Sequence, residues 1–180
     1  VMHAAAFQGR AEVVKLLLAY GIDANDVSAS DGFTPFHRTL WTNSERHVET
    51  MRVFLEDGKV EVDFVSHVGK TGALIATELK HTKVLDILLR EYGADPNFRN
   101  KRGDALVHVA IRAQDEKTLD MLLNNGADIT LEDAKGKSCR KIAKQLRSKA
   151  VLERINRAFE ELNTPNPNDN DRKENRGEEL

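Results

Sequence analysis

Six histidines and one cysteine are the residues of this sequence that could ligate a metal ion or supply a nucleophile. His47, His67 and His81 show neither the spacing of a zinc-binding helix nor a cysteine that could complete a site. Cys139 lies among basic residues, a setting that favours the thiolate, but no histidine is close in the sequence to act as its base. We therefore expect neither a metal site nor an activated nucleophile.

Other motifs that mark catalysis or cofactor binding are also missing from the 180 residues. The sequence contains no Gly-x-Gly-x-x-Gly motif, no phosphate-binding loop and no Gly-x-Ser-x-Gly element. The net charge of −2, from 27 basic and 29 acidic side chains, provides no polycation for nucleic acid or anionic lipid. The longest apolar stretches, at 13–20 and 84–89, are shorter than the roughly 20 residues that a membrane span needs. The sequence predicts a protein without catalysis, cofactor or membrane insertion.

Two sets of glycines recur along the chain with nearly the same period. The first set closes apolar segments and consists of Gly21, Gly58, Gly93 and Gly126, with separations of 37, 35 and 33 residues. The second set stands in turn-forming sequences and consists of Gly32, Gly69, Gly103 and Gly136, with separations of 37, 34 and 33 residues. Two marks with one period indicate an internal repeat.

Each repeated unit has the pattern of a turn, a short helix, a second turn and a longer helix. In the first unit the apolar positions of 13–18 form a broad helical stripe, which ends at Gly21 in a C-terminal capping position. The segment 119–126 repeats this pattern. Neither helix could bury such a face alone, whereas stacked neighbours can. The pattern therefore predicts an array that is stabilised by successive interfaces.

Short motifs connect the repeat to a known family. Thr34-Pro35-Phe36-His37 resembles the Thr-Pro-Leu-His signature of ankyrin repeats, and Gly93-Ala94-Asp95-Pro96-Asn97 resembles the family's exit from the second helix. Met2-His3-Ala4-Ala5 and Val107-His108-Val109-Ala110 carry a diluted form of the signature. The resemblance covers about residues 1–160 and implies an all-α solenoid of helix-turn-helix pairs joined by hairpin-like turns.

The resemblance also implies a domain organisation. It places an ankyrin repeat domain over 1–162, with repeats at about 1–28, 29–65, 66–99, 100–132 and 133–162. The first repeat lacks its opening hairpin. Because the chain begins with Val1 and not with Met, we expect that the true N-terminus is missing and that targeting signals are not readable. The segment 163–180 is rich in asparagine and charged residues, and we expect it to be disordered. A short linear motif or a linker to a downstream region is the alternative for this segment.

Three units depart from the family's pattern. The second carries extra residues around 43–47, which should lengthen the loop between its helices. The third has Thr71-Gly72-Ala73-Leu74 at the signature, so its first helix should begin loosely. The fifth has Ser138-Cys139-Arg140-Lys141 there, and such a polar last unit suits a terminal cap. An apolar stripe between Ala143 and Leu162 would close the array.

The resemblance gives roles to the other histidines and to two asparagines. His3, His37 and His108 occupy the signature position, where the family uses the imidazole to bond the backbone and join adjacent repeats. Asn25 and Asn97 occupy the hairpin position where some ankyrin proteins are substrates for asparagine hydroxylation, each with a leucine eight residues earlier. A plain turn role is the alternative for both asparagines.

Ankyrin proteins usually hold their partners with the hairpin tips and the exposed side of each first helix. Carrying these positions over by register predicts an apolar anchor and a basic strip, formed by Phe7, Phe33, Trp41, Leu79, Lys101, Arg102, Arg112, Lys135 and Lys137. Such a split groove would suit a partner protein with a bulky apolar residue and an acidic or phosphorylated stretch. Two alternatives stay open: the loop at 43–47 could fold over Trp41, and the basic strip could be an ordinary solvated face.

The sequence and the resemblance together predict a scaffold that binds a partner protein, in the cytoplasm or the nucleus, and performs no chemistry. One alternative is a regulator that resembles the inhibitory ankyrin proteins of the NF-kappa-B system. Another is the ankyrin portion of a larger enzyme, channel or toxin. A nucleic-acid partner would require strongly salt-dependent binding, which the near-neutral charge does not favour.

Overall fold

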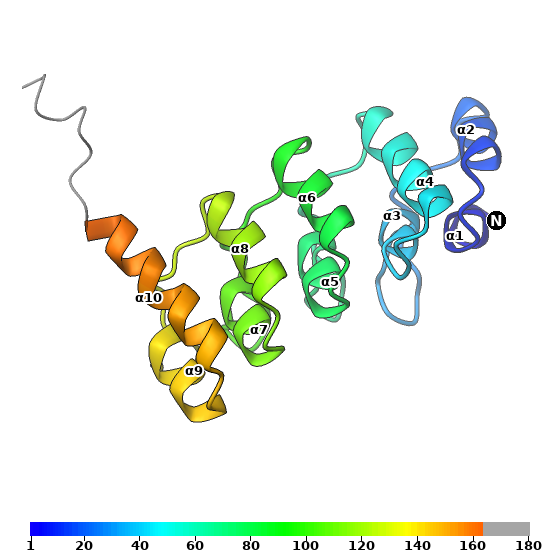
Figure 1. The fold of residues 1–180 in the computed structure, drawn as a ribbon. Helices are drawn as coiled ribbons and strands as arrows, with labels where there is room; N and C mark the ends of the chain where they lie inside the picture. The colour runs from blue at the N-terminus through cyan, green and yellow to red at the C-terminus, as the bar shows by residue number, and fades with distance from the viewer. Residues whose placement is uncertain (164–180) are drawn as a thin grey trace, which may run out of the picture.

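The computed structural model describes residues 1–163, which form five helix pairs stacked into an elongated array (Figure 1). The pairs are α1 (Met2–Phe7) with α2 (Ala11–Ala19), α3 (Pro35–Thr39) with α4 (Glu45–Glu56), α5 (Gly72–Glu78) with α6 (Thr82–Arg90), α7 (Leu106–Arg112) with α8 (Glu116–Asn124), and α9 (Cys139–Leu146) with α10 (Lys149–Asn163). The first helices of the pairs form one row and the second helices form another (Figure 1). No strand forms within residues 1–163, and the predicted all-α solenoid is confirmed.

The stacked helices bury an apolar core that runs through the array. Neighbouring pairs contact each other through like helices: α1 packs against α3, α2 against α4, α6 against α8, and α7 against α9. The helical stripes of the sequence supply this core, whose largest fully buried side chains include Phe36, Phe54, Leu88, Leu106 and Leu122. Each repeat is therefore stabilised mainly by its neighbours, as expected of a solenoid.

Three histidines join consecutive repeats, as the resemblance predicted. His3, His37 and His108 each donate from Nε2 to a backbone carbonyl oxygen of the following turn, over 3.0–3.2 Å. The accepting residues are Phe33, Phe64 and Leu131. In His37 and His108 the Nδ1 atom accepts a backbone N–H from three residues earlier, so both ring nitrogens are satisfied in the neutral form. Burial lowers the pKa of His37 to about 4.

The first helix of the third repeat does not begin loosely, contrary to the sequence-based prediction. Thr71 accepts the backbone N–H of Leu74 at 3.3 Å and caps α5. A Cβ atom at Gly72 would lie 3.0 Å from Leu40 and 3.1 Å from the ring of Phe36, so the missing side chain lets α5 approach these two residues of the preceding repeat. Glycine at this position therefore permits close packing and does not weaken the start of the helix.

The extra residues of the second repeat lengthen a helix as well as a loop. The loop between α3 and α4 is longer than its equivalents, but α4 already begins at Glu45 and has 12 residues, against nine in α2, α6 and α8. The prediction of a loop over 43–47 is thus wrong for residues 45–47, which belong to α4. His47 lies in α4, accepts from Ser44 at Nδ1 over 2.6 Å, and donates from Nε2 to the carbonyl oxygen of Phe7 over 3.0 Å.

The last helix pair closes the described part of the array. α10 buries Val151, Ile155 and Ala158 and packs against α9 and α8 (Figure 1). The predicted disordered segment 163–180 lies outside the described residues, except for Asn163 at the end of α10. None of the helices within residues 1–163 is both long enough and apolar enough to cross a membrane.

Candidate functional site

Three hollows lie in a row along one face of the array, each between the first helices of neighbouring repeats. We name them the α3–α5 pocket, the α5–α7 pocket and the α7–α9 pocket, with volumes of about 280, 350 and 470 Å³. Lys70 and Glu78 line both the first and the second pocket. Arg102, Asp104 and Arg112 line both the second and the third. The shared walls make the three pockets one continuous groove.

Trp41 and Leu79 bring exposed apolar surface to the α3–α5 pocket from two different repeats. Trp41 is 38% exposed and follows α3, whereas Leu79 is 45% exposed and follows α5. Phe7 is also exposed and meets the Trp41 ring edge-on, with 6.0 Å between the ring centroids. Trp41 is thus neither buried beneath the neighbouring loop nor isolated. It sits in an apolar cluster that faces the groove.

Arg38 fixes the orientation of Trp41. Its guanidinium lies 4.7 Å from the centroid of the Trp41 ring, and Nη2 also donates to both carboxylate oxygens of Asp31 at 3.0 and 2.9 Å. Burial opposes ionisation of Asp31, but its hydrogen bonds and the Arg38 charge together lower its pKa. One face of the indole is therefore already occupied by a cation, which leaves the pocket side for an apolar group.

Phe33 does not present the exposed contact surface that was predicted for it. Its side chain is only 8% exposed because it packs between Trp41 and His37, with centroid distances of 5.7 and 5.4 Å. Arg38 covers it further, at 5.4 Å from the ring centroid. Phe33 belongs to the lining of the α3–α5 pocket and meets the Trp41 ring in an edge-on contact.

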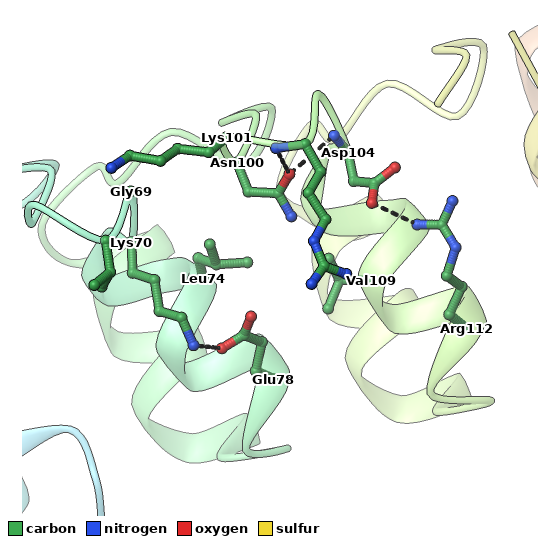
Figure 2. A pocket seen from close by; sticks show the side chains of 11 residues that line it. Gly69, Lys70, Leu74, Glu78, Asn100, Lys101, Asp104, Val109 and Arg112 are labelled. Atoms are coloured by element: carbon green, nitrogen blue, oxygen red, sulfur yellow. Dashed lines mark hydrogen bonds and ion pairs between the residues drawn. The ribbon is translucent and has the colours of Figure 1, made fainter. Parts of the chain in front are cut away.

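Figure 2 shows the α5–α7 pocket with one ion pair on each side. Lys70 pairs with Glu78 on the α5 side, and Asp104 pairs with Arg112 at 2.9 Å on the α7 side. The side chains of Leu74 and Val109 belong to the same lining and give the pocket an apolar floor (Figure 2). Hydrophobic surface and charged groups thus lie within one small hollow.

The same kind of pair recurs in successive repeats, and the sequence analysis missed it. In each case a hairpin residue bonds to a residue that is seven or eight positions later and lies on the first helix of the same repeat. The pairs are Asp31–Arg38, Lys70–Glu78, Asp104–Arg112 and Lys137–Gln145. The first three pairs join opposite charges, and this spacing of opposite charges was the signal available in the sequence.

Arg112 is not the open basic contact that was predicted. It donates to Asp104 and, from Nη2, to Oδ2 of Asp133 at 2.6 Å. The Asp133 side chain is 2% exposed, and its Oδ1 accepts the backbone N–H groups of Lys135 and Lys137. Burial opposes ionisation of Asp133, but these hydrogen bonds and the Arg112 charge together lower its pKa. Arg112 therefore holds two hairpins together, since its charge is shared between two carboxylates.

The other predicted basic residues lie on the hairpin tips at the edge of the groove. Lys101 donates to the backbone carbonyl of His67 across two hairpins, and Lys137 donates to Gln145 at 2.9 Å. Arg102 and Lys135 are exposed at the tips before α7 and α9. The predicted basic residues thus lie on neighbouring hairpins. Lys101 and Lys137 form hydrogen bonds within the protein, whereas Arg102 and Lys135 are exposed.

Asn25 and Asn97 lie in the turns that follow the second helices, outside the residues that line the three pockets. Asn25 donates from Nδ2 to the carbonyl oxygen of Lys59 at 2.7 Å. Asn97 donates to the carbonyl oxygen of Gly126 at 3.2 Å and accepts the backbone N–H of Asp128 at 2.7 Å. Both side chains therefore join consecutive repeats, and hydroxylation of either stays a prediction.

Cys139 is buried at the start of α9, and burial raises the pKa of its thiol to about 12. A thiolate is thus disfavoured here in spite of the basic neighbours in the sequence. Within residues 1–163 no group of three or more His, Cys, Asp or Glu side chains is arranged to hold a metal ion.

Two family models match this chain, and several known proteins are similar to part of it. A family model described as ankyrin repeats in three copies matches residues 42–133, and one described as ankyrin repeats in many copies matches residues 2–55. The inactive serine/threonine-protein kinase TEX14 of Bos taurus is 40% identical over 79 residues, 44% of this chain and 5% of that protein. SH3 and multiple ankyrin repeat domains protein 1 of Mus musculus is 32% identical over 129 residues, 71% of this chain and 6% of that protein.

A further relative covers more of the chain. Palmitoyltransferase AKR1 of Lachancea kluyveri is 28% identical over 151 residues, 84% of this chain and 20% of that protein. The chain thus spans only a small part of the length of each relative, and the relatives differ in what their names say they do. Each of them is similar to this chain only over the matched residues. The helix pairs, the histidine bonds between repeats and the matching family models together place the chain in the ankyrin repeat family.

Proposed function

We propose that the chain binds a segment of a partner protein in the groove formed by its three pockets. The observation that carries this proposal is the α3–α5 pocket, where Trp41 and Leu79 expose apolar surface around a hollow of about 280 Å³. Exposed tryptophan and leucine side chains in a concave site favour burial by a partner. Ankyrin repeats are interaction modules, which supports the same function.

The groove is built to bind with little rearrangement. Trp41 is held by Arg38 on its face and by Phe7 and Phe33 at its edges. The ion pair between Lys70 and Glu78 restrains the far rim of the same pocket. Groups that are already ordered lose less conformational entropy on association, so a preformed pocket favours affinity.

The proposed partner carries a bulky apolar residue for the α3–α5 pocket and an acidic or phosphorylated stretch for the basic hairpin tips. Arg38 already occupies one face of Trp41, which favours an apolar side chain over a cation as the anchor. The function needs no reaction by the chain itself. Binding alone would position or block the partner.

Capture of proteins from a lysate by the full chain and by a Trp41→Ala/Leu79→Ser double variant tests the proposal. We expect partners that the native chain retains to be lost from the double variant. Tyr20→Ala is the matched control, because Tyr20 is 78% exposed and lies outside the residues that line the groove. A captured partner should also change the fluorescence of Trp41, the single tryptophan of the chain. Equal capture by all three baits would refute the groove as the binding site.

A second proposal is that these repeats act as the partner-binding part of a larger protein. It is supported by two relatives, an inactive serine/threonine-protein kinase and a palmitoyltransferase. The region that matches this chain makes up 5% of the first protein and 20% of the second. The groove would then recruit a partner or substrate to another domain. Determining the full transcript that encodes this chain would test the proposal directly.

A further inference from the structure

The α5–α7 and α7–α9 pockets are positively charged within a chain that is slightly negative overall. Six basic residues line the two pockets, namely Lys70, Lys101, Arg102, Arg112, Lys135 and Lys137. Three acidic residues line them, namely Glu78, Asp104 and Asp133. The formal net charge of the whole chain is −2. Positive charge is therefore concentrated in this half of the groove.

The excess charge resides on the hairpin tips. Lys70 and Arg112 form ion pairs with groove carboxylates, so they contribute little net potential. Arg102 and Lys135 are exposed, and they stand on two successive hairpins and line the α7–α9 pocket together. Arg102 also lines the α5–α7 pocket, so one guanidinium serves both hollows.

The groups inside the pockets favour single carboxylates over a phosphate. Asp104 and Asp133 remain in the lining, with side chains that are 13% and 2% exposed, and a phosphate dianion would be repelled by both. The six cations are distributed over the linings of two pockets and are not gathered in one. Spaced single negative charges match such a distribution better than one concentrated double charge.

The pocket floors favour glutamate in particular. Leu74 and Val109 lie in the α5–α7 pocket, and Ile142 and Leu146 lie in the α7–α9 pocket. A side chain with two methylene groups can lay its stem on such a floor while its carboxylate reaches a basic rim. Aspartate has a shorter stem and would gain less from the same surface.

We propose that the α5–α7 and α7–α9 pockets bind a glutamate-rich segment of the partner protein, with one carboxylate on each side of the Asp104–Arg112 pair and with Arg102 in contact with both. This inference rests on the proposed function and specifies its partner. The apolar anchor of that partner would lie beside the acidic segment, since the α3–α5 pocket continues directly into the α5–α7 pocket through Lys70 and Glu78.

Fluorescence anisotropy with the full chain and a fluorescein-labelled decapeptide of glutamate tests this site without an identified partner. We expect saturable binding at low ionic strength, weakened at least tenfold by Arg102→Glu and by Lys135→Glu. Affinity should fall as salt is added, because the contacts are electrostatic. Lys83→Glu is the matched control and should change affinity less than twofold, since Lys83 is on α6 and outside the groove.

Several outcomes would overturn the proposal. They are absence of binding to the native chain, equal effects of Arg102→Glu and Lys83→Glu, and at least tenfold tighter binding of a phosphoserine peptide of equal charge. Thermal unfolding of each variant checks that the charge reversals leave the fold intact. If capture of a partner still depends on Trp41 and Leu79 while the decapeptide fails to bind, the acidic segment is wrong and the proposed function stands.

Discussion

Arg112 and Asp133 connect two repeats through a hydrogen bond of 2.6 Å between Nη2 and Oδ2. The arginine is the last residue of α7, and the aspartate lies in the hairpin before α9. Because Asp133 also accepts two backbone N–H groups of its own hairpin, one carboxylate orders the hairpin and fixes it to the preceding helix. Arg112 was predicted to contact a partner, but its bond to Asp133 stabilises the repeat array itself.

Replacing this carboxylate should destabilise the array. Asp133→Ala removes the Arg112 bond and leaves two hairpin N–H groups without their acceptor, so we expect the free energy of unfolding to fall by about 2–4 kcal/mol. Urea denaturation followed by circular dichroism measures the change. Asp26→Ala is the control, because the Asp26 side chain is 70% exposed, and its effect should stay within about 0.5 kcal/mol. Similar losses in the two variants would contradict the structural role of Asp133.

Acidification should destabilise the protein through His37. The unfolded imidazole takes up a proton near pH 6.5, but the buried one does so only near pH 4, since burial lowers its pKa. Protonation therefore favours the unfolded state, and stability that is fully present above pH 6.5 is lost as the pH falls towards 4. The expected loss from this residue is about 3 kcal/mol.

Urea denaturation at a series of pH values tests the His37 prediction. The slope of unfolding free energy against pH should be shallower in His37→Gln than in the native chain, although the variant will also be less stable at neutral pH. Burial lowers the pKa of His108 in the same direction, so part of the slope should remain. An unchanged slope in His37→Gln would show that the imidazole is not buried in its neutral form.

The two asparagines of the outer turns should differ in their contribution to stability. Asn97→Ala removes one donated and one accepted bond to the next repeat, whereas Asn25→Ala removes one donated bond to it. We expect losses of about 1–2 kcal/mol for Asn97→Ala and at most about 1 kcal/mol for Asn25→Ala. Thermal unfolding of both variants provides the comparison. A larger loss of stability in Asn25→Ala would mean that these hydrogen bonds do not determine which asparagine contributes more to stability.

Treatment of the native chain with an asparagine hydroxylase tests the other prediction for these residues. Added oxygen, located by peptide mass spectrometry, should fall on Asn25 or Asn97. Since the Asn97 amide is engaged on both of its polar atoms, we expect Asn25 to be modified first. No mass increase would remove the hydroxylation hypothesis.

Gln114 should be replaceable by glycine with a gain in stability. Its φ angle of 50° lies in the left-handed region, which is unfavourable for any residue that has a Cβ atom. At the equivalent place between α1 and α2 the residue is Gly9, with a φ of 64°. Because glycine tolerates a positive φ, Gln114→Gly is expected to raise the free energy of unfolding by about 0.5–1 kcal/mol. Ala113→Gly is the control, since its φ of −75° is helical, and it should lower stability by a similar amount. A loss in both variants would contradict the strain argument.

Leu16 and Ile87 occupy the same register position but should respond differently to truncation. Each is the sixth residue of a nine-residue second helix, yet Ile87 is 6% exposed and Leu16 is 57% exposed. Ile87→Ala should cost about 2–4 kcal/mol through loss of buried contacts, and Leu16→Ala should stay within about 0.5 kcal/mol. Parallel urea titrations measure both. Comparable losses would mean that α2 is covered in solution.

The sequence determined the repeat architecture, because period and turn chemistry are local properties. Glycines at a constant spacing mark where chain direction must change, and the apolar stripes between them require stacked neighbours. The role of the signature histidines was implied by the resemblance to ankyrin repeats and is confirmed by the bonds of His3, His37 and His108. Placing Trp41 and Leu79 in predicted contact positions required only that register.

What each contact residue does was decided by the tertiary structure. Phe33 and Arg112 occupy positions that register assigns to a partner, but ring packing buries the first and two carboxylates engage the second. The sequence predicted a weak helix start at Gly72. The packing against Phe36 and Leu40, which the missing side chain permits, involves residues of the preceding repeat that are far from Gly72 in the sequence. Burial and charge neutralisation depend on distances between repeats. Such distances are set by the packing of whole helix pairs, so local sequence patterns do not contain them.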